Sequence, residues 1–234
     1  MIMGTVSFGN NLSDSSIKHE SGLNVKDETT ITEDKDIYIG NTGVSITTSK
    51  GKLDLTGKDI IINVETSFDK ETKVNSGIFV KNSDKKLKDN EIKGNNLNIT
   101  NLGENKSASY YGNITDTGIM INPVLFGSSS LYNGKLTIKL ENDLNIKNFT
   151  TGISSNRAGR QQNPSDTLNT ELDIIAKNIN LINEELLEKS IGIFFYGGAE
   201  TKPVNENIGR FESIENLNIV NYAKGIEIRE NRNI

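Results

Sequence analysis

The sequence predicts an all-β protein: a single-stranded, right-handed parallel β-helix, or β-solenoid, with three short strands per coil and about six coils. Three observations lead to this prediction. Short segments of alternating apolar and polar residues recur in a fixed three-part order. Glycine, asparagine and aspartate, which favour turns, punctuate these segments at fixed places. No helical period competes over any long window, and only residues 184–189 could form a helical turn, inside a loop.

The first type of segment is a glycine followed by alternating apolar residues, as in Gly118-Ile119-Met120-Ile121. Residues two positions apart lie on the same face of a strand, so this pattern predicts a strand with one buried face. Only Ser155 breaks the apolar alternation. The copies begin at Gly22, Gly43, Gly77, Gly118, Gly152, Gly192 and Gly225.

The second type of segment has the pattern Asp/Asn-apolar-x-apolar-x-Asn, and Val64 replaces the closing asparagine in one copy. Its copies begin at Asp36, Asp59, Asn96, Asp143, Asn178 and Asn216. A weaker third segment precedes each of these. Its apolar positions are Ile31, Leu53 and Leu55, Ile92, Leu136 and Ile138, Leu172 and Ile174, and Phe211.

The cycle of three segments fits one coil of a β-helix. The shortest cycle, from Ile37 to Ile60, is 23 residues, which accommodates three short strands and three tight turns. A sandwich or barrel also contains many short strands, but it does not predict the same order with glycine and asparagine in fixed columns.

Equivalent residues of stacked coils should form columns along the axis, about 4.8 Å apart. One inward column would contain Ile37, Ile60, Leu97, Leu144, Ile179 and Leu217. A second would contain Leu23, Val44, Ile78, Ile119, Ile153, Ile193 and Ile226. Stacked asparagine amides can bond from layer to layer, and we expect an outward column of Asn98, Asn145, Asn180 and Asn218. A turn column would contain Asn41, Asn101, Asn148, Asn183 and Asn221. For the sequons at Asn98 and Asn148, this structural role is favoured over glycan attachment.

Insertions leave the predicted solenoid at two of its three turns. Before the glycine segment they are residues 65–76, 102–117 and 184–191, and after it residues 81–91, 123–134, 156–170 and 196–210. Because loops often carry function, the loop with Tyr110 and Tyr111 and the loop with Arg157 and Gln162 are candidate binding sites, although they could be tolerated surface insertions. Residues 1–21 are interpreted as a leading segment, and residues 22–234 as a β-helix truncated at its C-terminal end.

The composition excludes several classes of partner and of functional site. The 234 residues carry a net charge of −5 and no basic stripe, which argues against nucleic acid as a partner. The densest basic run, residues 85–88, is bracketed by Asp84 and Asp89 and is interpreted as a solvated loop. The absence of cysteine excludes disulfides, zinc–thiolate sites and cysteine nucleophiles. No run is long enough to span a membrane, and residues 1–4 do not resemble a signal peptide.

No catalytic, cofactor-binding or metal-binding residue is predicted, and no enzymatic activity is expected. The only histidine, His19, lies in a polar stretch and is interpreted as a surface residue. The segment from Gly51 to Asp59 lacks the spacing of a phosphate-binding loop, and Tyr196-Gly197-Gly198-Ala199 is interpreted as a flexible turn. One alternative is a polysaccharide lyase or glycoside hydrolase in which Asp36 and Asp59, on adjacent coils, form an acid/base pair or share a metal. That alternative requires an acidic cluster joined by exposed Arg, Lys or His on one sheet face, which the sequence does not reveal.

The Gly-Ile-x-Ile and Asn-Leu-x-Ile-x-Asn repeats between Gly22 and Ile228 resemble the β-helical passenger domains of bacterial autotransporter (type V secretion) adhesins. The resemblance implies a secreted or cell-surface stalk that is exported through the outer membrane and acts in virulence. It implies loops that bind proteins or glycans on host or neighbouring cells. Contact with a membrane would require a C-terminal translocator that this sequence does not contain. Cytotoxic passengers also occur in that family, so a toxic role is a further alternative.

Overall fold

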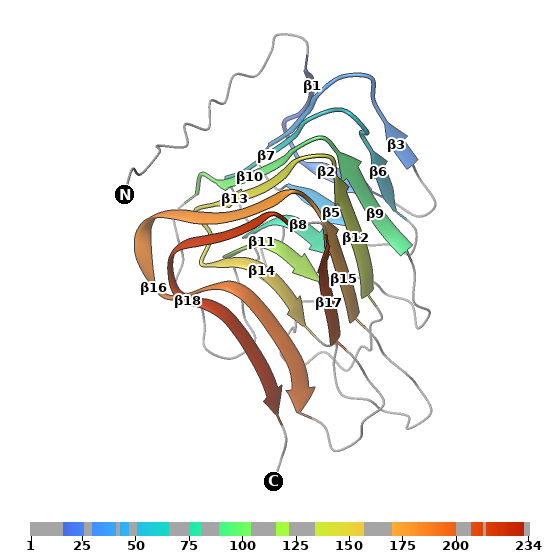
Figure 1. Ribbon diagram of the computed structural model, residues 1–234. Coiled ribbons are helices and arrows are strands. Elements are labelled where there is room, and N and C mark those ends of the chain that lie inside the picture. The colour runs from blue at the N-terminus through green and yellow to red at the C-terminus, as the bar shows by residue number, and fades with distance from the viewer. Residues whose placement is uncertain are drawn as a thin grey trace.

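The computed structural model describes residues 16–25, 30–40, 43–46, 51–65, 75–80, 89–103, 116–121, 134–156, 170–199, 207–212 and 214–231. In this part of the chain the secondary structure is all β, and every strand pairing is parallel. The strands form two curled sheets, one of twelve strands and one of six (Figure 1). The all-β, parallel character predicted from the sequence is therefore confirmed.

The twelve-stranded sheet has two arms that meet at its longest strand, β16 (Asn178–Ala199). The first, here called the asparagine arm, contains β1 (Ile17–His19), β4 (Ile37–Ile39), β7 (Ile60–Val64), β10 (Leu97–Asn101) and β13 (Asp143–Lys147). The second, the glycine arm, contains β2 (Leu23–Val25), β5 (Val44–Ile46), β8 (Asn75–Val80), β11 (Asp116–Ile121) and β14 (Thr151–Asn156). A final strand, β18 (Asn216–Asn231), pairs with β16 along both arms.

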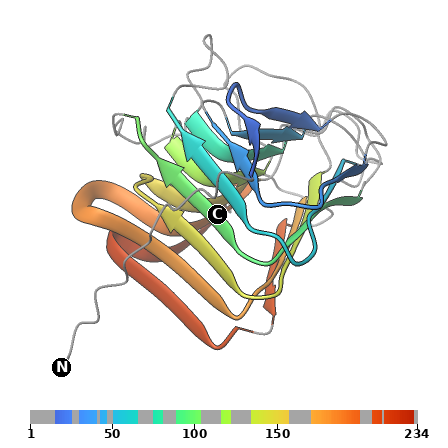
Figure 2. The ribbon, with the colours of Figure 1, turned by 90° about the horizontal axis from the view of Figure 1, so that it is seen from above.

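The six-stranded sheet closes the remaining side of the molecule (Figures 1 and 2). Its strands follow the glycine-arm strands in the chain, and they pair in sequence order. They are β3 (Thr30–Thr32), β6 (Lys52–Asp54), β9 (Asp89–Gly94), β12 (Gly134–Leu140), β15 (Thr170–Ile175) and β17 (Asn207–Glu212).

The register of the strands confirms the two predicted inward columns. Leu97 pairs with Ile60 on one side and with Leu144 on the other, and Ile119 pairs in the same way with Ile78 and Ile153. The third segment is confirmed as well, because its apolar residues pair through the six-stranded sheet from Ile31 to Phe211. These columns meet in one buried aliphatic core. Burial alternates along strands such as β10 and β13, whereas every residue of β11 is buried.

Most glycines of the glycine column are required by close packing. Only Gly22 and Gly43 have positive φ angles, of 89° and 71°. A Cβ atom on Gly118 would lie 2.6 Å from the carbonyl oxygen of Gly152, which is closer than real Cβ atoms approach. The sequence suggests turn conformation as the reason for this column, whereas the structure shows that most of its glycines let neighbouring strands approach.

The predicted helical turn at residues 184–189 is wrong, and so is the predicted loop at 184–191. Both segments belong to β16, which bends at the protruding corner of the molecule (orange in Figures 1 and 2). The predicted turn at residues 196–199 also lies in this strand. The strand persists because β18 supplies its hydrogen-bonding partner, with register shifts between Ile182 and Leu187 and between Leu187 and Ile191.

Candidate functional site

The outer side of the asparagine arm carries the predicted ladder of amides. Asn145 donates from Nδ2 to Oδ1 of Asn98 over 2.8 Å, and Asn180 donates in the same way to Asn145 over 2.7 Å. Asn218 adds a further bond of 2.7 Å to Asn180. Each inner asparagine thus satisfies one donor and one acceptor along the column, and its second N–H and second lone pair stay available.

The aspartates considered as an acid/base pair belong to a second ladder. Asp59 donates its backbone N–H to Oδ1 of Asp36 over 3.0 Å, which confirms that the two residues occupy equivalent positions. Oδ1 of Asp59 in turn accepts bonds from the backbone N–H and the Nδ2 group of Asn96, and from Nδ2 of Asn95. The geometry therefore assigns Asp59 to a turn in which the carboxylate holds the next layer in place.

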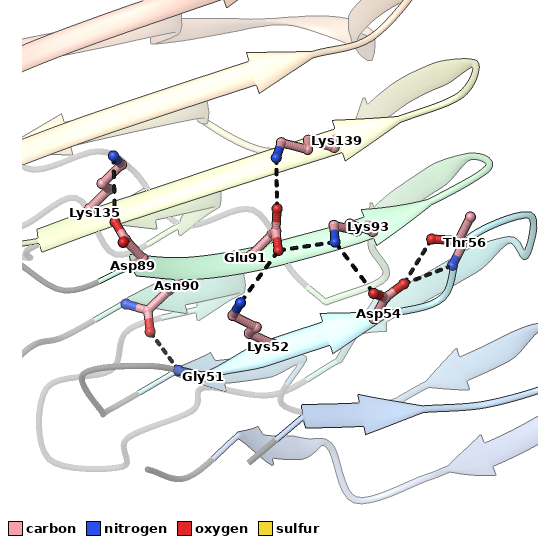
Figure 3. Close-up of polar contacts among 10 residues, drawn as sticks. All are labelled: Gly51, Lys52, Asp54, Thr56, Asp89, Asn90, Glu91, Lys93, Lys135 and Lys139. Carbon is pink, nitrogen blue, oxygen red and sulfur yellow. Dashed lines mark hydrogen bonds and ion pairs between the residues drawn. The ribbon is translucent and has the colours of Figure 1, made fainter. Parts of the chain in front are cut away.

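The outer face of the six-stranded sheet gathers acidic and basic side chains that lie far apart in the sequence (Figure 3). Glu91 is at its centre. Its Oε1 lies 2.9 Å from Nζ of Lys139, and its Oε2 lies 3.2 Å from Nζ of Lys93 and 3.9 Å from Nζ of Lys52. Lys93 also approaches Oδ2 of Asp54 at 3.4 Å. One carboxylate therefore binds three ammonium groups from three adjacent strands.

The same face continues toward β17 with a second group of ion pairs. Lys135 lies 3.4 Å from Oδ1 of Asp89 and 3.6 Å from Oε2 of Glu171. Arg210 lies 3.0 Å from Oδ1 of Asp173 and 3.8 Å from Oε2 of Glu171. This face is the acidic cluster joined by exposed cations that the sequence does not reveal, because strand register decides which charges meet.

The carboxylates of Glu91 and Asp54 stay ionised at neutral pH. Burial on its own would raise the pKa of Glu91, but hydrogen bonds from Lys139 and Lys93 outweigh it and hold the pKa below its ordinary value of 4.5. Hydrogen bonds from Thr56, aided by Lys93, hold the pKa of Asp54 below 3.8 despite partial burial. The pKa of Lys93 is raised by its hydrogen bond to Glu91 and by the charge of Asp54. A general acid or base works best with a pKa near the operating pH, and these shifts move the groups away from neutrality.

The outer side of the glycine arm carries an apolar cluster that the sequence analysis missed. Phe79, Met120 and Phe194 are buried there, apart from the main core, because they alternate with inward residues such as Ile78. At the β18 end of this row, the Arg229 guanidinium lies 5.7 Å from the centre of the Phe194 ring. The sequence signal for this cluster is an apolar residue at the outward position between two inward ones, as Phe79 in Gly-Ile-Phe-Val.

A buried polar corner joins the two arms of the large sheet. The Asp116 carboxylate is almost fully buried and accepts bonds from Nδ2 of Asn101 (3.0 Å) and from the backbone N–H of Thr150 (3.2 Å). Thr150 returns a bond from Oγ1 to the Asp116 carbonyl oxygen over 2.9 Å. Burial, with the nearby charge of Asp116, raises the pKa of Tyr222. The corner fastens consecutive layers, and of its residues only Asn101 belongs to a periodic pattern of the sequence, the predicted turn column.

Other residues singled out in the sequence have varied outcomes. His19 is half-buried in β1, and its Nε2 atom is enclosed without a hydrogen-bond partner in the described part of the chain, so it is not a simple surface residue. Asn148 and Asn221 occupy the turn column with φ angles of 62° and 60°. The candidate loops with Tyr110 and Tyr111 and with Arg157 and Gln162, the lysine run at 85–88 and Asn41 lie outside the described residues.

Among the described residues, no group of three or more His, Asp or Glu side chains is arranged to hold a metal ion. No helix in that same part of the structure has the length and apolar character needed to cross a membrane. Comparison of the chain with protein-family models, with curated proteins and with solved structures finds no match.

Proposed function

We propose that the chain is a single-stranded, right-handed parallel β-helix with three strands per coil and about six coils. The order of the strands supports this winding, because the chain visits the asparagine arm, the glycine arm and the six-stranded sheet in turn. Crossovers between parallel strands of one sheet are almost always right-handed, which supports the proposed hand. Each strand of the six-stranded sheet would belong to one coil.

The proposed function is that of a surface-exposed or secreted scaffold: a structural stalk and adhesin segment, not an enzyme. The observation that supports it is the bonding of side chains to one another along two outer faces. Amides bond to amides along the asparagine arm, and carboxylates bond to lysine and arginine along the six-stranded sheet. Such ladders hold successive coils in register and consume the groups that acid/base chemistry would need.

In this proposal, binding to cells belongs to loops and not to the coils. The resemblance to autotransporter passenger domains supports export through the outer membrane of a bacterium and display at the cell surface. It also supports a protein or glycan on a host or neighbouring cell as the partner. The insertions at residues 102–117 and 156–170 remain the candidate binding elements, since they interrupt an otherwise regular scaffold.

Loop replacement tests this assignment. The parts of the two insertions that lie between the described elements, residues 104–115 and 157–169, are each replaced by a short Asn-Gly turn, so that strands β11, β14 and β15 stay intact. Binding to cells and to a glycan array is compared with that of the intact protein. A matched control replaces residues 66–74, an insertion at the same turn that was not singled out. We expect loss of binding for at least one candidate loop and none for the control. Unchanged binding with both candidate loops removed would rule out the loop assignment.

A polysaccharide lyase or glycoside hydrolase is the second candidate, because the charged face around Glu91 unites carboxylates with exposed lysines. This candidate predicts cleavage of acidic glycans that depends on calcium or has an acidic optimum, and that is lost in Glu91→Gln. The test is a panel of uronate-containing and sulfated glycans with product analysis. Absence of cleavage across the panel would remove this candidate and leave the scaffold proposal standing.

A further inference from the structure

One outward column of the asparagine arm changes its chemistry from layer to layer (β7, β10 and β13 in Figure 1). Its members pair in register on five adjacent strands, β4, β7, β10, β13 and β16, and they are Tyr38, Ile61, Asn98, Asn145 and Asn180. All five residues are partly exposed. This column, here called the mixed column, therefore presents an aromatic ring, an aliphatic side chain and three amides at intervals of about 4.8 Å.

The amides of the mixed column have hydrogen-bonding groups that the ladder does not use. A primary amide offers two N–H donors and two acceptor lone pairs. The Asn145 amide uses one donor toward Asn98 and one acceptor toward Asn180. The Asn98 side chain accepts the bond from Asn145, and within the described part of the chain it donates none. A ligand with a donor and an acceptor at each layer can therefore bind without breaking the ladder.

The ring of Tyr38 extends over Gly40, where another residue would place its side chain. A Cβ atom on Gly40 would lie 3.3 Å from Cε1 and 3.4 Å from Oη of Tyr38, so the edge of the ring occupies that space. Tyr38 is still partly exposed, which leaves ring surface for a ligand. A sugar has an apolar C–H face that packs on aromatic rings and a rim of hydroxyl groups that bond to polar side chains. The mixed column offers both kinds of contact.

The charges around the mixed column favour an uncharged ligand. The column itself contains no acidic or basic residue. A neighbouring column, two positions earlier in the chain at each layer, contains Asp36, Asp59 and Asp143, which are all partly exposed. On the other side, Lys147 is bound by Glu184 at 2.6 Å. The three carboxylates would repel a ligand that carries uronate or sulfate groups, so an acidic glycan is disfavoured.

We propose that the mixed column binds an uncharged, extended polysaccharide whose chain lies along the stack. An extended β-linked chain of neutral hexoses repeats its hydroxyl groups at close to the layer spacing, so successive sugars bond to Asn98, Asn145 and Asn180. A sugar further along the same chain packs on Tyr38 and Ile61. Each contact is weak alone, and the affinity comes from their repetition along one ligand. This inference goes beyond the proposed function, because it adds a surface on the coils to the loops proposed for cells, and it does not depend on those loops.

Calorimetric titration of the whole chain with neutral β-linked glucan and mannan oligosaccharides of increasing length tests the proposal. The affinity should rise with ligand length until the ligand spans the five layers from Tyr38 to Asn180. Uronate-containing oligosaccharides of the same lengths should bind roughly tenfold or more weakly. No binding of any neutral oligosaccharide, or tighter binding of the uronate series, would overturn the proposal. An affinity that does not depend on length would contradict a ligand that lies along the stack.

Two variants test the residues of the mixed column. Asn98→Asp keeps the oxygen that accepts the bond from Asn145 and removes only the N–H groups, whereas Tyr38→Ala removes the ring. Each should weaken the affinity for the longest neutral oligosaccharide roughly tenfold. Ile175→Ala, at a partly exposed outward position of β15 in the other sheet, is the control and should leave the affinity unchanged. A circular dichroism melt establishes that all three variants are folded. Unchanged affinity in both test variants, or equal weakening by the control, would overturn the proposal.

The loop replacements separate this inference from the proposed function. Proteins that lack residues 104–115 or 157–169 should bind the neutral oligosaccharides as well as the intact chain does. Loss of that binding would place the oligosaccharide site on the loops and overturn the inference, whatever the effect on cells. Retention of oligosaccharide binding together with unchanged binding to cells would support the inference and overturn only the loop assignment.

Discussion

Glycine and asparagine occupy fixed columns of this protein for different physical reasons. Gly118 has no room for a side chain, since its neighbour's carbonyl oxygen lies where a Cβ atom would be. Asn145 serves through its amide, which donates to the layer below and accepts from the layer above. A substitution at either residue should therefore act on the contact between layers, and the two effects can be separated.

Gly118→Ala should destabilise the fold by about 1–3 kcal/mol, because the added methyl group forces the neighbouring backbone to move. Gly225→Ala is the matched control in the same column: the nearest atom to its Cβ would be Cδ1 of Ile219 at 4.0 Å, and we expect a change within about 0.5 kcal/mol. Urea unfolding of both variants measures the difference. Equal losses for the two glycines would contradict the packing explanation.

Asn145→Ala removes two side-chain hydrogen bonds from the amide ladder, and Asn218→Ala removes one. At roughly 1 kcal/mol for each bond, we expect losses of about 2 and about 1 kcal/mol. The measurement is again the free energy of unfolding by urea. If Asn218→Ala lowered the free energy of unfolding as much as Asn145→Ala or more, the stabilisation by the ladder would not be proportional to the number of hydrogen bonds removed.

At the scale of elements, β16 shows how tertiary pairing overrides a local signal. Residues 184–189 resemble a helical turn in the sequence, but Leu187 pairs with Tyr222 of β18, which is far away in the chain. The bend places Lys189 at a φ angle of 63°, an unfavourable conformation for a side chain with a Cβ atom. The corner of the long strand therefore holds local strain that its pairing with β18 offsets.

Replacing Lys189 by glycine should relieve that strain and stabilise the protein by about 0.5–1 kcal/mol. Glu188→Gly is the neighbouring control; its φ angle is not positive, so glycine should destabilise by about 0.5–1 kcal/mol there through chain entropy. Thermal melts of the two variants should shift in opposite directions. A lower melting temperature for Lys189→Gly would indicate that its side chain, and not its backbone, matters at this corner.

The charged face of the six-stranded sheet makes stability depend on pH. Because the pKa of Glu91 is lower in the folded state than its ordinary value of 4.5, its ion pairs stabilise the fold above that pH, and this contribution disappears as the pH falls through the folded pKa. Glu91→Gln should cost about 1 kcal/mol at pH 7, and the difference from wild type should shrink steadily in acid. Glu185→Gln, at an exposed site, is the control and should change stability little at any pH. If the stability difference between Glu91→Gln and wild type stayed constant with pH, the loss would come from altered side-chain packing and not from the lost charge.

The positions of most strands follow from the sequence, and the features that the sequence did not predict share one cause. Alternation of apolar residues is a local property, so it correctly located the strands and the inward columns, such as the one through Leu97. The charged face, the buried Asp116 corner and the continuous β16 depend on which distant residues become neighbours. Register between strands that are separated by long insertions decides those neighbours, and composition does not encode it.

At the scale of the whole molecule, stability should vary with position along the stack. Among the strands that the structure describes, β13 is paired on both sides, whereas β18 is paired on one. In stacked folds each layer is stabilised mainly by its neighbours, so the last layer should open most often. Hydrogen exchange should be roughly tenfold or more faster in β18 than in β13. Uniform protection of all strands would indicate a single cooperative unit.

The short strands of the first two described layers have a mechanical consequence. Backbone hydrogen bonds between parallel neighbours run along the stack, so a pull on its two ends loads all bonds at one boundary together. Strands β1 to β6, which form the first two layers, have three residues each, whereas β12 has seven and β15 six. Under tension the described strands should therefore separate first at the β1 end, while the longer strands in the middle stay paired. The strength of this end would set the greatest load that the stack can bear.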